Sequence, residues 1–370
     1  MRILYCSDDS SDHNRRFVSK LSAAGHQVFF FDLSCSSPAD YPFAQNVVHI
    51  GHGIRWERAS DPESVKRFLP EFRSTVARIR PDLIHAGPVQ SCGYLAALAD
   101  FHPLVVMSWG SDLLIDANRG PQWVHATQTA LRRADGFMCD CEAVRNAARK
   151  HSSLPDWRIA QFPWGISAGA FSPQGSRAEI PFGPETVRFI CTRSWEPIYG
   201  MGTLLKAFLK AHTVDGRLRL LLVGDGSQRG WIHHFISQNS LSDVVLTPGW
   251  LPRPELPHWF RAATAYVSCA QSDGTSVSLL EAMATGLPVL VTDIPSNREW
   301  VREEANGWLA SGTADFTAKL LRVCRLRSGQ RDSISQINRK TVASRADWDA
   351  NFPLLLQLFG RIMDSRAVSA

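Results

Sequence analysis

Two acidic side chains flank a turn that could bind a negatively charged ligand, within residues 268–295. This stretch, SCAQSDGTSVSLLEAMATGLPVLVTDIP, is typical of a strand, a polar loop, a helix and a second strand. Backbone N–H groups at a helix N-terminus attract anions, and the loop Ser272-Asp273-Gly274-Thr275-Ser276 stands at that position. Gly274 permits close approach to the backbone, and Thr275 and Ser276 add hydroxyl donors. Such a turn suits a diphosphate.

The two carboxylates have a different use, because they repel phosphates. Asp273 comes just before the helix, and Glu281 lies one turn beyond Val277 on the same face. Carboxylates are strong acceptors for the hydroxyls of neutral polyols, such as a sugar and a ribose diol. Asp273 could instead be a helix N-cap, and Glu281 a solvated helix position. The neighbouring residues of Glu281 are apolar, however, and an ionised glutamate is rarely buried without a partner.

Composition and motifs exclude several classes of protein. The chain has 370 residues, 44% of them hydrophobic and 20% charged, which suits two globular domains. Its net charge of +5 is not concentrated in either half, unlike that of a nucleic-acid-binding protein. The G-x-G-x-x-G, G-x-x-x-x-G-K-[ST] and G-x-S-x-G motifs are absent, which argues against a dehydrogenase, a P-loop NTPase and an α/β-hydrolase.

The sequence also bears on metals and on cellular location. The cysteines and histidines show no spacing typical of a metal site, and no D-x-D loop is placed to bridge a diphosphate through a metal. With no long apolar run and no signal peptide, we expect a protein of the cytoplasm. A basic cluster contains Arg322, Arg325, Arg327, Arg331 and Arg345. It is either a solvated helical face or a weak contact with the inner face of an anionic membrane.

Short apolar runs alternate with amphipathic stretches along the whole chain. The runs predict strands at 2–6, 27–33, 82–85, 104–108 and 136–139, and again at 188–191, 218–223, 244–246, 265–269 and 288–292. The stretches predict helices at 15–24, 63–80, 93–100, 123–133, 142–151, 203–212, 229–238, 254–262, 277–284, 314–327 and 349–363. This alternation indicates an α/β protein with parallel, doubly wound sheets, which bind ligands at the carboxyl ends of their strands.

Residues 268–295 resemble the E-x7-E region of retaining family 4 glycosyltransferases, with Asp273 in place of the first glutamate. Other segments resemble the same family: TRSWEPIYG at 192–200, LVGDG at 222–226, TPGWL at 247–251, NGWL at 306–309, and Trp348 with the final helix. The resemblance implies the GT-B fold, in which two Rossmann-like domains face a central cleft and a C-terminal helix crosses back to the first domain. It predicts an acceptor domain at 1–170, a linker at 171–186, a donor domain at 187–345 and the returning helix at 346–370.

The resemblance also implies a role for each matching residue. Arg193 would neutralise the donor diphosphate, Glu281 would hold the ribose diol, and Asp273 would hold the transferred sugar. The other donor-binding residues would be Gly274, Thr275, Ser276, Val277, Gly224, Trp250, Leu251, Tyr199 and His13. The acceptor side would include Trp109 and Asp112, from a Trp-Gly-Ser-Asp turn similar to the family's H-G-x-D, and His85. No metal or other cofactor is implied.

The implied activity is transfer of a sugar, with retention, from a nucleotide diphosphate sugar, UDP- or GDP-linked, to a hydroxyl acceptor. The acceptor would be a sugar, a lipid-linked glycan or a small molecule, as in glycan, polysaccharide or glycosylated-metabolite synthesis. Three residues depart from the family pattern: Tyr199 replaces a lysine, Asp273 a glutamate and Trp109 a histidine. Two alternatives therefore stay open: a nucleotide-sugar epimerase or hydrolase, and a catalytically silent nucleotide-sugar-binding partner of a transferase.

Overall fold

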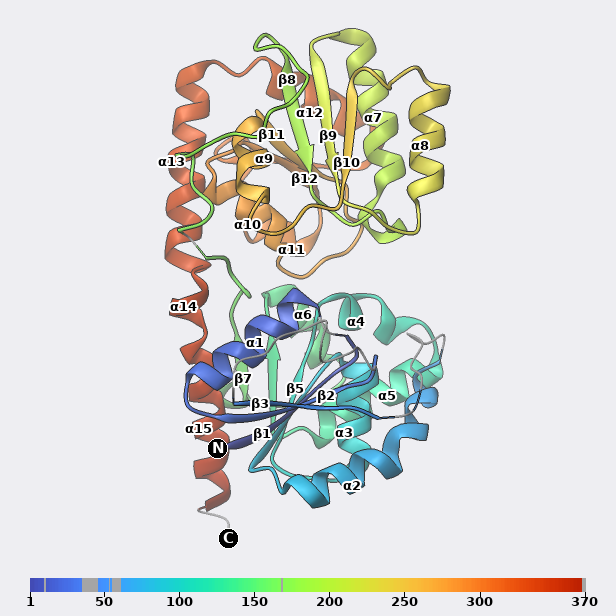
Figure 1. Ribbon diagram of the computed structural model, residues 1–370, viewed down its shortest axis with the longest axis vertical. Helices are drawn as coiled ribbons and strands as arrows, with labels where there is room; N and C mark the ends of the chain where they lie inside the picture. The colour runs from blue at the N-terminus through green and yellow to red at the C-terminus, as the bar shows by residue number, and fades with distance from the viewer. Residues whose placement is uncertain (10, 35–45, 53, 55–60, 168, 368–370) are drawn as a thin grey trace. The chain divides into compact units, whose positions relative to one another are not determined.

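The computed structural model describes residues 1–9, 11–34, 46–52, 54, 61–167 and 169–367. The chain forms two compact units (Figure 1): Met1–Phe162 with Phe352–Ala370, and Pro163–Asn351. Residues 163–170, which we assigned to the first domain, and the linker predicted at 171–186 are part of the second unit. The C-terminal helix α15 (Pro353–Ala367) packs on strands of the first unit, including Gly136–Cys139.

The first unit contains a seven-stranded parallel sheet in the order β3-β2-β1-β4-β5-β6-β7. Its strands are β1 (Arg2–Ser7), β2 (Gln27–Asp32), β3 (Val47–Ile50), β4 (Leu83–Ala86), β5 (Leu104–Met107), β6 (Gly136–Cys139) and β7 (Ile159–Gln161). The α-helices before α15 are α1 (Asp12–Ala23), α2 (Leu69–Ile79), α3 (Tyr94–Ala99), α4 (Ser111–Leu114), α5 (Pro121–Arg133) and α6 (Glu142–Arg149). The strand order reverses between β1 and β4, which is the switch point where such sheets bind ligands.

The second unit contains a six-stranded parallel sheet in the order β10-β9-β8-β11-β12-β13. Its strands are β8 (Val187–Cys191), β9 (Leu218–Val223), β10 (Val245–Gly249), β11 (Ala265–Ser268), β12 (Val289–Thr292) and β13 (Gly307–Ala310). Its α-helices are α7 (Met201–Val214), α8 (Arg229–Gln238), α9 (Leu256–Ala262), α10 (Val277–Ala284), α11 (Pro295–Arg298), α12 (Gly312–Cys324), α13 (Ser328–Arg345) and α14 (Trp348–Asn351). The two Rossmann-like sheets confirm the predicted α/β class.

Within the described ranges, no helix of either unit combines the length and apolar character needed to cross a membrane.

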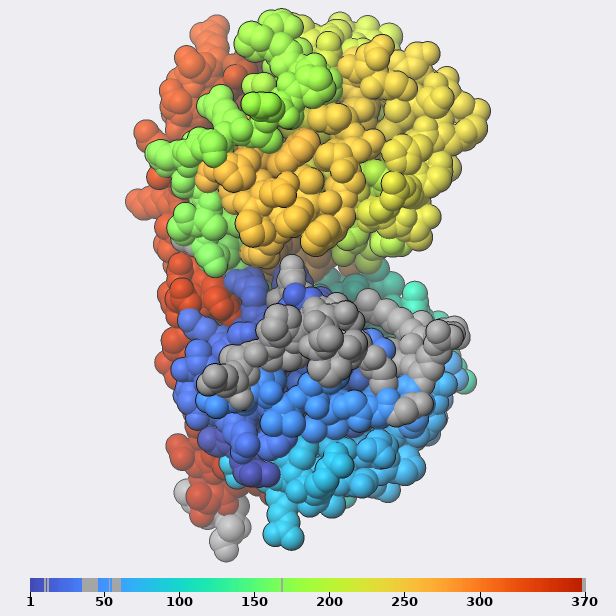
Figure 2. All heavy atoms as spheres, in the orientation of Figure 1, coloured from blue at the N-terminus to red at the C-terminus, as the bar shows by residue number. Residues whose placement is uncertain are grey.

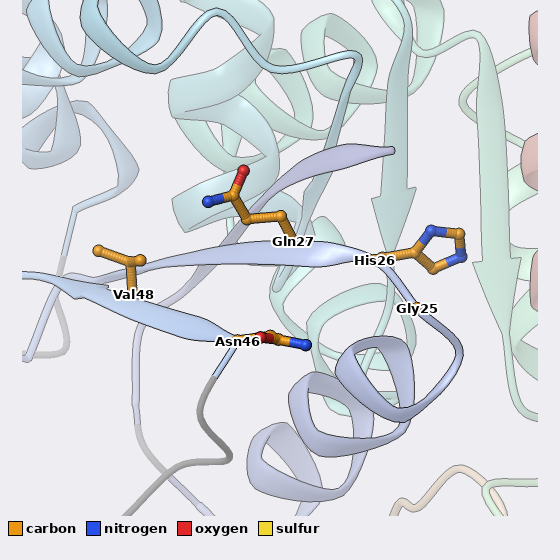
Figure 3. Close-up of a pocket in the computed structure, with 5 residues that line it drawn as sticks. All are labelled: Gly25, His26, Gln27, Asn46 and Val48. Carbon is orange, nitrogen blue, oxygen red and sulfur yellow. The ribbon is translucent and has the colours of Figure 1, made fainter.

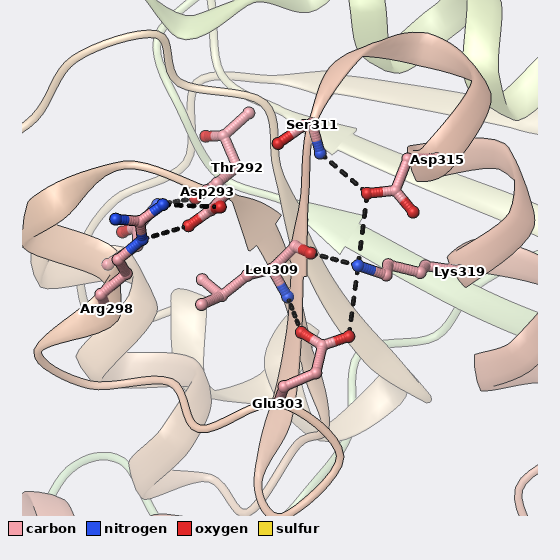
Figure 4. Close-up of polar contacts among 9 residues, drawn as sticks. Thr292, Asp293, Arg298, Glu303, Leu309, Ser311, Asp315 and Lys319 are labelled. Atoms are coloured by element: carbon pink, nitrogen blue, oxygen red, sulfur yellow. Dashed lines mark hydrogen bonds and ion pairs between the residues drawn. The ribbon is translucent and has the colours of Figure 1, made fainter.

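Strands β3, β7 and β13 were not predicted, and all three lie at sheet edges. The outward-facing backbone groups of Leu309 in β13 are bonded by side chains instead of by another strand (Figure 4). The Leu309 N–H donates to Glu303 Oε2 at 2.8 Å, and the Lys319 ammonium donates to the Leu309 carbonyl. Lys319 also lies 3.2 Å from carboxylate oxygens of both Glu303 and Asp315. These contacts fix α12 and the loop before β13 to the edge of the sheet.

Residues 170–178, which we name the strap, are held against α9. Arg261 donates from Nε to the Ser172 carbonyl at 2.8 Å and from Nη2 to the Ala170 carbonyl at 3.2 Å. The Ala178 N–H donates to the His258 carbonyl at 2.9 Å. Figure 2 shows the strap in green, lying against the gold surface of the second unit. Half of the predicted linker, residues 171–178, is therefore held against α9, and Phe171 is part of the core beside Phe260.

Candidate functional site

Loops that follow β8, β9 and β11 meet at the carboxyl end of the second sheet. Gly224, at φ +137°, lets the loop after β9 pass close to the loop after β8, because a Cβ there would lie 2.8 Å from the Arg193 carbonyl oxygen. Gly200, at φ +65°, does the same against the loop after β11, where a Cβ would lie 2.1 Å from the Cys269 carbonyl oxygen. Both glycines are required by the backbone, and they bring Arg193 and Tyr199 beside the residues that precede α10.

Arg193 is the centre of this cluster. Its Nη2 lies 2.8 Å from Asp273 Oδ2, and its Nη1 donates to Ser276 Oγ at 2.8 Å and to Ser278 Oγ at 3.2 Å. The guanidinium carbon lies 4.1 Å from the centre of the Tyr199 ring, which is a cation–π contact. Only 10% of the Arg193 side chain is exposed. Four side chains therefore fix the orientation of this cation.

Burial and charge act against each other in the pair Arg193–Asp273. Burial favours the neutral form of Arg193, but the Asp273 carboxylate keeps the pKa of Arg193 above its ordinary value. Burial raises the pKa of Asp273, which Arg193 and bonds from Ser276 and Gly274 only partly oppose. The Asp273 side chain keeps 18% of its surface exposed, so a ligand can reach it.

The N-cap residue of α10 is not Asp273, which the sequence offered as a possible cap. Ser276 is the N-cap residue, and its Oγ accepts from the Leu279 N–H at 3.4 Å. Asp273 is therefore not the cap, and its carboxylate is turned to Arg193 instead. Gly274, Thr275 and Ser276 are buried, and Val277 is the first residue of α10. Ser278, which was not predicted, links this turn to the hydroxyl of Tyr266 at 2.8 Å.

Glu281 lies one turn further along α10 and is 3% exposed, as its apolar neighbours predicted. Its Oε1 lies 3.2 Å from Nη2 of Arg253, in the loop between β10 and α9. Sequence reasoning missed Arg253. The available signal was indirect, because a buried glutamate requires a cation that a single sequence does not identify.

Two predicted donor-site residues lie in the same loop as Arg253. Trp250 is 69% exposed and Leu251 is half-buried against the core of the second unit. Gly224 is joined to this loop, because its N–H donates to the Gly249 carbonyl at 2.9 Å. An exposed indole beside the carboxyl end of β10 is available to stack on a planar ring.

In the first unit, the structure brings together His13 and Trp109. Their ring centres are 5.8 Å apart, and Phe17 lies 6.1 Å from Trp109. His85, which we predicted on the acceptor side, has no exposed surface. Its ring lies 6.3 Å from that of Phe17 and 5.1 Å from that of Tyr5, and neither of its ring nitrogens has a hydrogen-bond partner in the described chain. Burial lowers the pKa of His85 to about 3, so the imidazole is neutral.

Asp112 holds together the loops that follow β4 and β5. Its Oδ1 accepts from Ser108 Oγ at 2.6 Å and from the Leu113 N–H at 3.1 Å, and its Oδ2 accepts from the Val89 N–H at 3.0 Å. The side chain is 2% exposed, and burial raises its pKa although these bonds oppose the shift. Asp112 thus shapes the turn that carries Trp109.

One further hollow of the first unit lies away from the ligand-binding end of its sheet. A hollow lined by Gly25, His26, Gln27, Asn46 and Val48 lies at the beginnings of β2 and β3 (Figure 3). It is at the opposite end of the sheet from the switch point, where parallel sheets bind ligands. Among the residues that the structure describes, no group of three His, Cys, Asp or Glu side chains is placed to hold a metal ion. Independence of metal stays a prediction.

Comparison with known proteins finds two family models that match this chain, one in each half. Residues 2–141 match the family model "Glycosyl transferase 4-like", and residues 185–325 match "Glycosyl transferases group 1". D-inositol 3-phosphate glycosyltransferase of Paenarthrobacter aurescens is 24% identical over 325 residues, which cover 80% of this chain and 79% of that protein.

Solved structures share the fold over almost the whole length. Sucrose-phosphate synthase of Thermosynechococcus elongatus has a TM-score of 0.85 at 18% identity, covering 99% of this chain and 100% of the other. HepE of Anabaena, in complex with UDP and glucose, has a TM-score of 0.77 at 14% identity, covering 97% and 99%. At such identities these likenesses establish the architecture of two Rossmann-like domains.

Proposed function

The chain belongs to the glycosyltransferases of the group 1 and family 4 type, with the GT-B fold, and we propose that it transfers a sugar from a UDP-sugar to an acceptor hydroxyl with retention of configuration. The observation that carries the proposal is the cluster at the start of α10. A helix N-terminus and two carboxylates lie within one βαβ unit there, and an oriented arginine from the loop after β8 meets them. The UDP complex of HepE supports uracil as the base.

In this proposal the Arg193 guanidinium and the N–H groups of residues 274–277 bind the diphosphate. The diphosphate replaces Asp273 as the partner of Arg193, and Asp273 turns to the hydroxyls of the transferred sugar. Glu281 accepts from the ribose hydroxyls. Charge develops on the leaving diphosphate in the transition state, so a fixed cation at this place lowers the barrier.

The chemical step needs no carboxylate nucleophile. The bond from the anomeric carbon to the diphosphate oxygen breaks, and the acceptor oxygen forms a bond to the same face of that carbon. The leaving diphosphate takes the acceptor proton. We propose that the donor binds to the second unit and that the acceptor binds to the first unit near Trp109 and Asp112. The reaction would take place in the cytoplasm.

Thermal unfolding with UDP, GDP, ADP and UDP-glucose tests donor binding. We expect UDP to raise the midpoint, because a ligand at 100 times its Kd stabilises the folded state by about 2.7 kcal/mol. The matched control is Arg217→Ala, which removes an exposed arginine paired with Asp215 before β9, at the other end of the sheet. This control should respond to UDP like the wild type. A response to GDP or ADP alone would contradict the proposed donor.

Product analysis tests the transfer itself. NMR of the product from a UDP-α-sugar should show the α-anomer, whereas a β-anomer would contradict retention. Turnover of the donor without any acceptor, to free sugar or to an epimerised nucleotide sugar, would support the hydrolase or epimerase alternative. UDP binding without turnover in the presence of an acceptor library would support the catalytically silent partner.

Tyr199→Leu is expected to lower kcat by about 2- to 30-fold, because a partly buried cation–π contact contributes about 0.5–2 kcal/mol. Tyr199→Phe is the matched control, since it keeps the ring beneath Arg193 and removes only the hydroxyl. Steady-state kinetics of both variants measure this change in kcat. Equal loss in the two variants would show that the hydroxyl, and not stacking on Arg193, is what Tyr199 contributes.

A further inference from the structure

We propose that Arg253 is a positioning residue for the nucleotide ribose, which it serves by holding the buried carboxylate of Glu281 charged and in one orientation. The inference rests on the proposed function, in which Glu281 accepts hydrogen bonds from the ribose hydroxyls. Arg253 adds a residue to that site for which the sequence motifs gave no role.

The need for a cation follows from the burial of Glu281. The seven helical residues from Ser278 to Ala284 are all buried, and Glu281 is only 3% exposed, so its carboxylate is removed from water. A carboxylate removed from water stays ionised only with a nearby positive charge and hydrogen bonds. Arg253 supplies such a charge, with Nη2 3.2 Å from Oε1 of Glu281.

Arg253 is itself supported from the other side. Its guanidinium carbon lies 6.0 Å from the centre of the Phe171 ring, which belongs to the strap. The Phe171 ring packs edge-on against Phe260 of α9, with ring centres 5.9 Å apart. A planar guanidinium suits this arrangement better than an ammonium, because it can contact a ring face while its edge meets a carboxylate.

The pair determines how Glu281 would bind a ribose. A charged acceptor forms a hydrogen bond roughly twice as strong as a neutral one. An oxygen held by Arg253 also keeps the carboxylate from rotating, so its acceptor directions are fixed before the nucleotide arrives. The side chain of Arg253 is 32% exposed, which leaves the pair close to solvent and to an entering nucleotide.

The test compares binding of UDP with binding of 2′-deoxyuridine 5′-diphosphate by calorimetry. We expect the wild type to prefer UDP by at least about tenfold, as loss of a hydrogen bond to a charged group predicts. Glu281→Gln should reduce this preference to about twofold or less, and Arg253→Met should reduce it to a similar extent. Arg253→Lys keeps the charge and should retain most of the preference. Arg217→Met, remote from the site, should equal the wild type.

The double variant Arg253→Met/Glu281→Gln separates positioning from direct contact. It leaves no unpaired buried charge, so it remains informative where Arg253→Met fails to fold. We expect it to match Glu281→Gln in both affinities, because Arg253 acts through Glu281. Weaker binding of both nucleotides by the double variant than by Glu281→Gln would overturn the inference in favour of a direct contact.

The two proposals fail in different ways. A wild-type preference retained in Arg253→Met but lost in Glu281→Gln would overturn the role of Arg253 and leave the proposed function intact. Failure of the wild type to bind UDP would overturn the proposed donor, and the role of Arg253 with it.

Discussion

Arg193→Ala is expected to lower kcat/KM for sugar transfer by about 10²- to 10³-fold, the usual effect of removing one fixed donor aimed at developing charge. Ser276, Ser278 and Tyr199 orient the guanidinium, so it stays in place when the leaving diphosphate replaces Asp273 as its partner. The loss should appear in kcat as well as in KM, because charge on the diphosphate grows in the transition state. Steady-state kinetics with a UDP-sugar make the measurement.

The same substitution leaves Asp273 buried without its cation, which by itself lowers stability. Arg193→Ala/Asp273→Asn removes both charges. It shows whether the kinetic effect persists when no unpaired carboxylate lowers the stability of the fold. Arg217→Ala is the matched arginine control and should keep wild-type kinetics. Near wild-type kcat/KM in a folded Arg193→Ala protein would contradict the assigned role of Arg193.

The first unit is expected to lose stability in mild acid because of His85. Its pKa is lowered by burial from the ordinary 6.5 to about 3. Below pH 6.5 the unfolded chain therefore binds a proton at this residue that the folded chain does not bind. The stability contributed by neutral His85 is present above pH 6.5 and falls by up to about 1.4 kcal/mol for each pH unit between 6.5 and about 3.

His85→Phe removes this titration and keeps an aromatic ring among Tyr5, Phe17 and Phe359. Native-state hydrogen exchange of the β1 and β4 amides reports the unfolding free energy of the first unit. Relative to the wild type, the variant should gain about 2 kcal/mol between pH 7.5 and pH 5. His234→Gln, on the exposed face of α8 in the second unit, is the matched control for substitution of a histidine outside the first unit. Parallel pH curves for His85→Phe and the wild type would refute the prediction.

The interior strands and the edge strand β10 could be predicted from the sequence, whereas the edge strands β3, β7 and β13 could not. Strand β5 (LVVM) and the last four residues of β9 (LLLV) are buried on both faces and form continuous apolar runs. At the edges, β3 (VVHI) is partly exposed and β7 (IAQ) has only three residues. β13 (GWLA) follows a loop and begins with a glycine. Short, mixed segments of this kind become strands because a neighbouring strand offers hydrogen bonds. The residues of the segment alone do not indicate that such a neighbour is present.

The candidate site could likewise be predicted only in part from the sequence. The residue types around α10 predicted an anion-binding turn with two carboxylates, and the structure brings Arg193, Tyr199 and Asp273 together there. The pairing of Asp273 with Arg193 could not be predicted, because the two residues come from different βα loops that only the sheet order makes adjacent. Arg253 lies in a proline-flanked turn with no motif of its own, and it becomes significant only beside Glu281.

Strand β13 ends the second sheet, and its outer backbone groups are already occupied within the molecule. The Leu309 N–H and carbonyl are bonded by Glu303 and Lys319, and the Gly307 carbonyl accepts from the Glu304 N–H at 2.8 Å. A free strand edge is a template on which another chain can add a strand and begin a fibril. At β13 that template is blocked by charged side chains, so self-association through this edge would first require two ion pairs of Lys319 to break.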